Sequence, residues 1–289
     1  MPTITLNKKV FENLVGKKLP LDELKERISY LGTDLESIEN DEITVEIFPN
    51  RPDLLSEQGF ARAFSSFIGI KTGLRQYKIK KSSHRVKIDS SVASVRPYTA
   101  CAIVKNLKFD NEKIKELIQI QEKLHVTYGR NRKKAAIGIY PFEKIQTPIY
   151  YKALPKEKIR FQPLESEREM TATEILNNHP AGKEYAHLLE KYDSYPVFMD
   201  SNSQILSMPP IINAHELGKV NEKTKDIFIE CSGHNINASE QVLNLIVTTL
   251  AEMGGEIYSV DVKYKTRKIT TPNLDPEKIK EIEQRMEET

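Results

Sequence analysis

The chain has 289 residues, a length that suits one large domain or two modest ones. Hydrophobic residues make up 39% and charged residues 29%, which indicates a folded chain with much charged surface, and the net charge of +2 is too small to identify a class of partner. Because no apolar run approaches the ~20 residues of a membrane span, no signal-peptide core is present and Cys101 and Cys231 lack metal-binding spacing, we expect a cytoplasmic protein without membrane contact, metal site or disulfide.

Residues 1–75 are predicted to form a small α+β domain. Alternating apolar residues indicate strands at 3–6 and 43–47. Apolar residues at helical spacing indicate helices at 21–31 and 59–68. The mixture of short strands and helices predicts a compact unit with its own core.

A larger domain is predicted over residues 76–270, after a basic stretch at 69–83 that lacks apolar periodicity and resembles a linker. Its pattern switches repeatedly between strand and helix, and the turn at 201–203 suggests a hairpin. The predicted strands are 84–88, 98–106, 135–140, 195–200, 205–207, 226–230 and 256–265, and the predicted helices are 112–124, 171–178, 183–190 and 241–253. The fold class is therefore predicted to be α+β, with a small amino-terminal α+β domain followed by a larger mixed-sheet α+β domain.

Residues 271–289 have a different character. A charged helix is predicted over 279–286 after Pro276, and it has almost nothing to bury. We therefore expect this stretch to be the start of a truncated following domain, and the chain to be a fragment.

A basic run follows the predicted helix at 112–124. It contains Arg130, Arg132, Lys133 and Lys134, and such runs can hold a phosphate backbone. A solvated turn accounts for the same composition, and the pattern alone favours that simpler interpretation.

Two polar clusters follow apolar strands in the second half of the chain. One is Asn213-Ala214-His215-Glu216, and the other runs from Glu230 through His234 to Asn237. If strands 205–207 and 226–230 are neighbours in one sheet, the clusters share one end of it. The pattern favours a simpler role for 235–239 as the cap of the following helix, although a helix terminus can also bind an acyl oxygen.

Standard catalytic signatures are absent from the sequence. It contains no Gly-rich phosphate loop, no GxSxG and no HExxH. The unusual feature is Met208-Pro209-Pro210-Ile211-Ile212, which suits neither a helix nor an ordinary strand. Such a segment predicts a rigid apolar rim that presents the polar residues after it.

Five stretches resemble the phenylalanyl-tRNA synthetase β subunit of the archaeal and eukaryotic type. The first is similar to its amino-terminal domain, and the other four to its central editing domain. In chain order they read EIFPNRPDLLSEQGFARAF, LHVTYGRNRKKAAIGIYPFEKI, EILNNHPAGKEYAHLL, YPVFMDSNSQILSMPPIIN and KTKDIFIECSG. They follow the family's order across nearly all of the chain, which is more specific than any single motif.

The resemblance implies a function in proofreading. In this family the editing domain hydrolyses tyrosine wrongly esterified to phenylalanine tRNA, so the expected partner is the mischarged 3′ end of that tRNA. The ligation reaction, with its ATP and magnesium, belongs to the whole α2β2 synthetase, whose α subunit pairs with a carboxyl-terminal part beyond this chain. The fragment itself is expected to need no cofactor.

The resemblance also implies roles for individual residues. Pro209 and Pro210 would form a rigid wall beside an aromatic ring, and Glu230 would accept the tyrosine hydroxyl. The expected catalytic residues are Asn213, His215, Asn235 and Asn237; the expected substrate-binding residues are Ile205, Leu206, Met208, Pro209, Pro210, Ala214, Glu216 and Glu230; and the expected tRNA-binding residues are Arg130, Arg132, Lys133 and Lys134.

Two departures from the family's pattern leave alternatives open. The family commonly has Asn-Ser-Glu after the proline wall, where this chain has Asn213-Ala214-His215-Glu216, and an acid where this chain has Asn235. A non-catalytic tRNA-binding or assembly scaffold with a weakened editing site is therefore the main alternative to an ester hydrolase. A free-standing nucleic-acid-binding protein is a third.

Overall fold

The computed structural model describes residues 1–275, which form two compact units. The smaller unit comprises Met1–Arg75 together with Asp110–Asn131, and the larger unit comprises Gln76–Phe109 and the residues from Arg132 onward. This division differs from the predicted ranges, because the segment 110–131 groups with the smaller unit. The predicted helix at 279–286 lies outside the described residues.

The smaller unit contains an antiparallel sheet in the order β1-β3-β2. The predicted strands and helices are confirmed within two residues, whereas α1 and β2 were not predicted. Helix α1 follows β1 directly, with Asn7 accepting the Lys9 and Val10 N–H groups as its cap. The elements are β1 (Thr3–Asn7), α1 (Lys8–Val15), α2 (Leu21–Tyr30), β2 (Asp34–Glu39), β3 (Glu42–Glu46), α3 (Glu57–Phe67) and α4 (Asn111–Val126).

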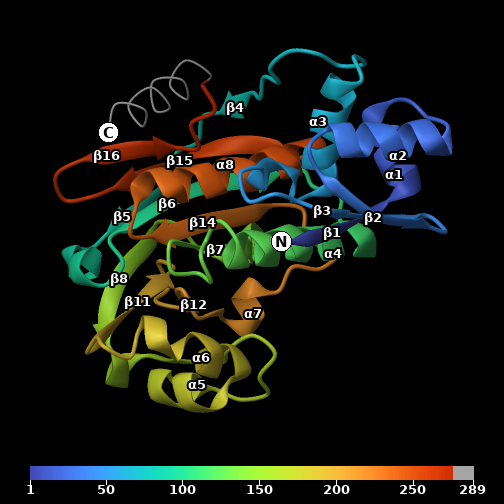
Figure 1. The fold of residues 1–289 in the computed structure, drawn as a ribbon. Helices are drawn as coiled ribbons and strands as arrows, with labels where there is room; N and C mark the ends of the chain where they lie inside the picture. The colour runs from blue at the N-terminus through green and yellow to red at the C-terminus, as the bar shows by residue number, and fades with distance from the viewer. Residues whose placement is uncertain (276–289) are drawn as a thin grey trace, which may run out of the picture. The chain divides into compact units, whose positions relative to one another are not determined.

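The larger unit is built on one mixed sheet, in the order β13-β12-β11-β8-β5-β15-β6-β14-β7, with β4 and β16 pairing along β15. The long helix α8 lies over strands β6 and β14, and helices α5 and α6 lie together away from it (Figure 1). The strands are β4 (Ile79–Lys80), β5 (Arg85–Ile88), β6 (Tyr98–Lys105), β7 (Ala135–Pro141), β8 (Ile149–Pro155), β9 (Arg160–Phe161), β10 (Met170–Thr171), β11 (Ser194–Met199), β12 (Ile205–Met208), β13 (Ile212–Asn213), β14 (Ile227–Gly233), β15 (Glu256–Lys263) and β16 (Lys268–Thr271). The helices are α5 (Ala172–Asn178), α6 (Pro180–Tyr185), α7 (His215–Gly218) and α8 (Ile236–Glu252).

Most predicted elements of this unit are confirmed, including the α+β class and the hairpin, in which Phe198 pairs with Ser207. Three details were wrong. Helix α8 begins at Ile236, five residues earlier than predicted, because Asn235 caps it. The helix predicted at 183–190 is α6 followed by a 3-10 turn at Ala186–Leu188. Strand β14 continues to Gly233, so Glu230 lies in mid-strand and not at its end.

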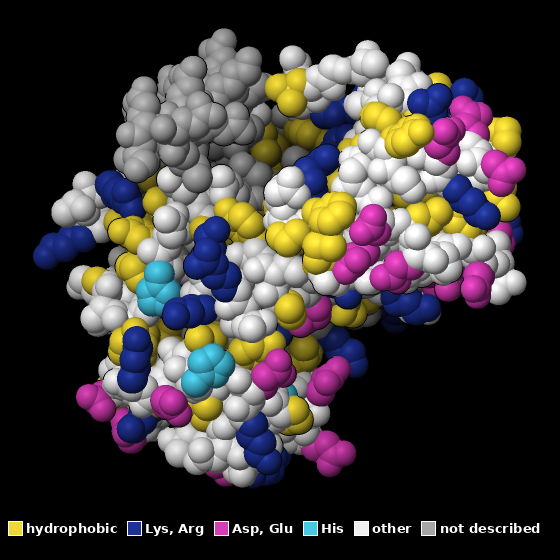
Figure 2. All heavy atoms as spheres, viewed as in Figure 1, with side chains coloured by type: hydrophobic (Ala, Val, Ile, Leu, Met, Phe, Trp, Pro, Cys, Tyr) yellow, Lys and Arg dark blue, Asp and Glu magenta, His cyan; other side chains and the backbone are white. Residues whose placement is uncertain are grey.

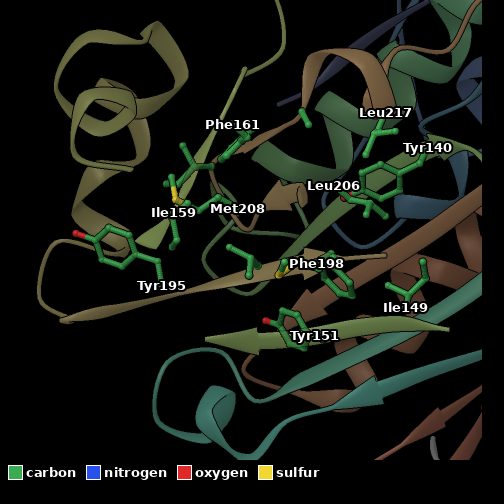
Figure 3. Packing of buried hydrophobic residues seen from close by; sticks show 14 of the residues in the cluster. Tyr140, Ile149, Tyr151, Ile159, Phe161, Tyr195, Phe198, Leu206, Met208 and Leu217 are labelled. Atoms are coloured by element: carbon green, nitrogen blue, oxygen red, sulfur yellow. The ribbon is translucent and has the colours of Figure 1, made fainter. Parts of the chain in front are cut away.

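The two faces of strand β14 have different neighbours. A Cβ added to Gly233 would lie 3.1 Å from Ser239 Oγ, so this side of the strand faces α8. Because side chains alternate along a strand, Phe228 and Glu230 point to the opposite face. There the core is aromatic: Tyr151 and Phe198 stack with their ring centroids 4.3 Å apart (Figure 3).

No helix among residues 1–275 has the length and apolar character that crossing a bilayer requires.

Candidate functional site

A group of polar side chains is buried inside the apolar core of the larger unit. The Tyr140 hydroxyl on β7 donates to Ser207 Oγ over 2.7 Å and lies 3.2 Å from Glu230 Oε1 and 3.4 Å from Asn213 Oδ1. Tyr140, Ser207 and Glu230 are almost completely buried, and Asn213 is half-buried. We call Tyr140, Ser207, Asn213 and Glu230 the polar cluster. Buried polar groups are costly unless they are paired, so this cluster is a specific feature of the core.

The polar cluster forms although its strands are not neighbours. The condition under which the two clusters would share one end of the sheet, that strands 205–207 and 226–230 are neighbours, is not met, since β11, β8, β5, β15 and β6 lie between β12 and β14. The edge strand β7 supplies the link, because Asn213 Nδ2 donates to the Ile139 carbonyl over 3.4 Å. The Tyr140 ring lies beside Leu206 and Leu217 (Figure 3), so its hydroxyl reaches residues of both β12 and β14.

Gly138 provides the space for this arrangement. It pairs with Glu230 across strands β7 and β14. A Cβ at this position would lie 2.2 Å from the Tyr140 hydroxyl and 2.4 Å from Glu230 Oε1, distances that real Cβ atoms do not adopt. Only glycine, which has no Cβ, fits at position 138 while the Tyr140 phenol and the Glu230 carboxyl remain in contact.

Burial controls the protonation of Glu230, whose exposure is 2%. Loss of water raises the pKa of this carboxyl from 4.5 to about 8, although neighbouring Arg96, Tyr140 and Ser232 offset part of the rise. The side chain is thus mainly neutral at pH 7 and can donate as well as accept a hydrogen bond. Its Oε2 atom is buried, and among the described residues no side chain or backbone group forms a hydrogen bond of normal geometry with it, although Ser232 lies nearby.

The proline segment forms a buried turn between β12 and β13. The Ile211 N–H donates to the Met208 carbonyl over 2.9 Å and closes a four-residue turn around Pro209 and Pro210, which are joined by a cis peptide bond. The predicted wall residues Leu206, Met208, Pro209 and Pro210 are buried, and Ile205 is half-buried. We call residues Met208–Ile211 the proline turn.

Of the four predicted catalytic residues, only Asn213 belongs to the polar cluster. Asn235 caps α8, since its Oδ1 accepts the Ala238 N–H over 3.0 Å, so its capping role is confirmed. Asn237 is exposed in the first turn of α8, the helix that packs on the sheet face opposite Glu230. Within residues 1–275 neither side chain has a recorded hydrogen bond to the polar cluster.

The remaining predicted residues around Asn213 have mixed environments. Ala214 is buried, and His215 begins the short helix α7, where its N–H donates to the Gln162 carbonyl over 2.8 Å. The His215 Nδ1 atom is buried without a hydrogen-bond partner in the described part of the chain. Glu216 is exposed, and its carbonyl accepts from Lys144 Nζ over 2.7 Å.

The predicted tRNA-binding residues divide into two kinds. Arg130 and Lys133 are exposed and Lys134 is half-buried. Arg132 instead donates through Nη1 to the Ile211 carbonyl over 2.8 Å. Basic, acidic and apolar side chains are interspersed on the face of the molecule in Figure 2, so charge alone does not identify a nucleic-acid surface.

Sequence reasoning missed the central residues of the site. Tyr140 and Ser207 lie in strongly apolar strands, where the pattern predicts core packing alone, and Gly138 looks like an ordinary small strand residue. Arg96, 2% exposed, was not singled out either. The sequence offered one signal for such residues, a single polar side chain within an apolar run. That signal does not reveal which other polar side chain it contacts in the folded protein.

No group of three or more His, Cys, Asp or Glu side chains among residues 1–275 could hold a metal ion.

Known proteins resemble this chain in sequence and structure. The phenylalanine–tRNA ligase β subunit of Thermococcus sibiricus is 43% identical over 281 residues, which cover 96% of this chain and 50% of that protein. The β subunit of Archaeoglobus fulgidus is 43% identical over 275 residues, covering 95% and 49%. The chain thus spans about half the length of the curated relatives it matches.

A solved structure covers the same region. The crystal structure of an N-terminal fragment of the phenylalanyl-tRNA synthetase β subunit from Pyrococcus horikoshii matches with a TM-score of 0.91 at 41% identity, over 95% of this chain and 80% of that one. No protein-family model matches the chain.

Proposed function

Since the chain belongs to the phenylalanyl-tRNA synthetase β subunit family, we propose that its larger unit hydrolyses tyrosine wrongly esterified to phenylalanine tRNA. The polar cluster carries this proposal. It combines a neutral buried carboxyl that has an unpaired oxygen, a hydroxyl and an amide beside an apolar turn. A site that accepts tyrosine and rejects phenylalanine needs such groups, because it must form a hydrogen bond with the tyrosine hydroxyl.

The physical need for such a site follows from how pockets discriminate. A pocket shaped for phenylalanine rejects an added hydroxyl by only ~100-fold. A second pocket can require the hydroxyl instead, because a buried polar group left unpaired by phenylalanine costs about 1–3 kcal/mol. Correctly charged tRNA is then protected while the tyrosyl ester is removed.

In this proposal the phenol of the misplaced tyrosine meets Glu230. The Oε2 atom either donates to or accepts from the phenol oxygen, while the other carboxyl oxygen, Oε1, lies beside the Tyr140 hydroxyl, which Ser207 Oγ holds in place. The buried residues Leu206, Met208 and Pro209 contribute apolar surface beside the ring.

Hydrolysis of an aminoacyl ester needs a positioned water and polarising groups more than a strong nucleophile. We assign the ester end of the site to Asn213 and His215, which follow the proline turn. Asn237 and the cap of α8 take part only if the bound tRNA end extends to that helix. The exposed side chains of Arg130, Lys133 and Lys134 are proposed to contact tRNA phosphates.

Two observations favour a second candidate, a tRNA-binding or assembly scaffold with a weakened site. Ala214 lacks the hydroxyl that the family commonly carries there, and the side chain of Asn235 is occupied in capping α8. In a scaffold the polar cluster would persist as a structural feature without ester hydrolysis.

Ester loss separates the two candidates. The chain is incubated with tyrosyl and phenylalanyl esters of phenylalanine tRNA, and release of the amino acid is followed. Selective loss of the tyrosyl ester, lowered roughly 100-fold by Asn213→Ala, supports the hydrolase. Loss no faster than in buffer, with measurable tRNA binding, supports the scaffold, provided that it recurs in the complete heterotetramer.

The rest of the synthetase function is proposed for the whole enzyme. Ligation of phenylalanine with ATP and magnesium is assigned to the α2β2 assembly, through the α subunit and the part of β that this chain does not span. We place the assembly in the cytoplasm, where translation uses its product.

A further inference from the structure

Two arginines of the larger unit connect the proline turn to strand β14. Arg96 lies in the segment before β6 and is 2% exposed. Its Nε donates to Ser232 Oγ over 3.1 Å, and its Nη2 donates to the Ser232 carbonyl over 2.5 Å. Because Ser232 follows Glu230 by two residues, its side chain lies on the same face of β14 as the carboxyl.

The same guanidinium also holds the start of the basic run. Arg96 Nη2 donates to the Arg132 carbonyl over 3.1 Å, and Nη1 donates to the Lys133 carbonyl over 3.4 Å. The backbone at Arg132 is left-handed, with a φ of 64°, as it is at Arg130 and Asn131 before it. Non-glycine residues keep this conformation only where their surroundings over-determine it, and hydrogen bonds from a buried cation are such a constraint.

Arg132 continues the connection to the proline turn. Its Nη1 donates to the Ile211 carbonyl over 2.8 Å and lies 3.4 Å from the Pro210 carbonyl. Its Cζ lies 4.2 Å from the centroid of the Tyr185 ring, which is 5% exposed. Although Arg132 is half-buried, a guanidinium that stacks on a buried ring and bonds to carbonyls of the proline turn has much of its hydrogen-bonding capacity directed at the protein and not at a phosphate.

The arrangement is costly to keep, which indicates a role. The acceptors recorded for Arg96 are carbonyls and a hydroxyl, and burial lowers the pKa of this guanidinium. A buried cation whose hydrogen-bond acceptors are neutral oxygens loses its hydration without a directly bonded carboxylate, and the attraction of nearby Glu230 offsets only part of that loss. Apolar packing would have filled the same volume at lower cost.

We propose that Arg96 and Arg132 are positioning residues that fix the proline turn relative to Glu230 and thereby set the fit of the aromatic ring. The inference rests on the proposed function and deepens it. It also reassigns Arg132, which the sequence placed among the tRNA-binding residues, to the wall of the amino-acid pocket. Arg96 connects β14 to the backbone at the start of the basic run, and Arg132 connects that backbone to the proline turn.

The test is the split between kcat and KM for both esters in Arg132→Lys, which keeps the charge but not the planar fork. We expect kcat for the tyrosyl ester to fall ~10- to 100-fold, because small displacements of a binding wall are expensive. KM for the tRNA should stay unchanged, and the preference for tyrosyl over phenylalanyl ester should shrink. The exposed neighbour Lys133→Gln is the contrast, with an expected rise in KM at unchanged kcat.

A second variant covers the case in which Arg132→Lys does not fold, as judged by circular dichroism and thermal unfolding. Tyr185→Leu removes the ring that orients the guanidinium, and we expect the same loss in kcat to a smaller extent. A raised KM with wild-type kcat in Arg132→Lys would show that Arg132 contacts the tRNA. That result would overturn this inference but leave the proposed function unaffected. A wild-type chain that hydrolyses neither ester overturns the proposed function and this inference with it.

Discussion

Glu230 determines the electrostatic character of the buried polar cluster. A carboxyl that is neutral near pH 7 can bind a phenol without bringing a full charge into the core. Its free Oε2 atom is the feature that apolar packing does not explain. Glu230 therefore lowers the stability of the fold at alkaline pH, and in the proposed function it also makes a directional contact with the substrate hydroxyl.

The raised pKa of Glu230 predicts a pH-dependent stability. The folded protein retains a proton between the unfolded value of 4.5 and the folded value of about 8, so the free energy of unfolding falls as the pH rises through that window. Each retained proton gives a slope of up to about 1.4 kcal/mol per pH unit. Glu230→Gln, which is neutral at every pH, should be the more stable protein at pH 9 and comparable to the wild type at pH 5.

Urea unfolding of wild type and Glu230→Gln at several pH values measures this difference. The comparison is needed because Glu57 contributes a slope of the same sign in both proteins. Parallel curves for the two proteins would mean that Glu230 is ionised in the folded state.

Gly138 offers a steric test of the same cluster. In Gly138→Ala the new methyl group would overlap the Tyr140 hydroxyl and Glu230 Oε1, so the strand or both side chains must move. We expect a loss of about 1–3 kcal/mol in the free energy of unfolding, typical of overpacking, and a loss of tyrosyl-ester hydrolysis. Unchanged stability and activity would show that the phenol and carboxyl are not held together in solution.

At the scale of elements, the sequence predicted the larger strands and helices because their apolar periodicity is strong. The helix at 21–31, the strand at 98–106 and the hairpin around 201–203 are all found. Short elements such as β13 and α7 were not predicted, because two to four residues carry no measurable period.

Sheet order could not be read from the sequence in the same way. Pairing between distant strands depends on how whole faces pack, so the sequence left open whether strands 205–207 and 226–230 are neighbours. They are not, and their polar side chains Ser207 and Glu230 are linked only through the Tyr140 hydroxyl. Asn213 and Glu230 were singled out from the sequence, whereas Tyr140, whose hydroxyl lies beside both, was not. The contact between them arises only in the folded sheet.

The start of α8 provides a test at this scale. Asn235→Ala removes the oxygen that accepts the Ala238 N–H, and we expect a loss of about 1 kcal/mol in stability. Asn237→Ala, an exposed change in the first turn of the same helix, should have little effect, which makes it the matched control. Thermal unfolding measures both, and equal stabilities for the two variants would contradict the capping role.

The smaller unit contains a second buried carboxyl, at the start of α3. Glu57 is 8% exposed, and burial together with Glu116 and Glu112 raises the pKa of Glu57 from 4.5 to about 7. The Glu57 N–H donates to Glu116 Oε1 over 2.6 Å, which brings α4 into this unit. The two acids therefore repel each other increasingly as the pH rises.

Glu57→Gln should relieve this repulsion while an amide oxygen still accepts the Asn7 N–H. We expect the variant to be more stable than the wild type by on the order of 1–3 kcal/mol above pH 7, with the difference vanishing near pH 4.5. Glu26→Gln, an exposed change on α2, is the control. A difference between Glu57→Gln and wild type that does not vary with pH would rule out the buried-carboxyl explanation.

For the whole molecule, the similarity to the Pyrococcus horikoshii fragment covers both compact units. The chain spans about half the length of its curated relatives, and the proposed proofreading site lies inside the larger unit. That site is assembled from an edge strand, an interior strand and a hairpin turn that lie far apart in sequence. The proposed proofreading function therefore depends on the intact sheet and not on any one motif.

The most direct measurement is the ratio of kcat/KM for the tyrosyl ester to that for the phenylalanyl ester, in wild type and in Glu230→Ala. One hydrogen bond to the phenol predicts a wild-type ratio of roughly 10 to 100, and removal of the carboxyl should bring it close to one, while Glu230→Gln keeps part of the preference. A preference for the tyrosyl ester that survives unchanged in Glu230→Ala would contradict the claim that this buried carboxyl recognises the substrate hydroxyl.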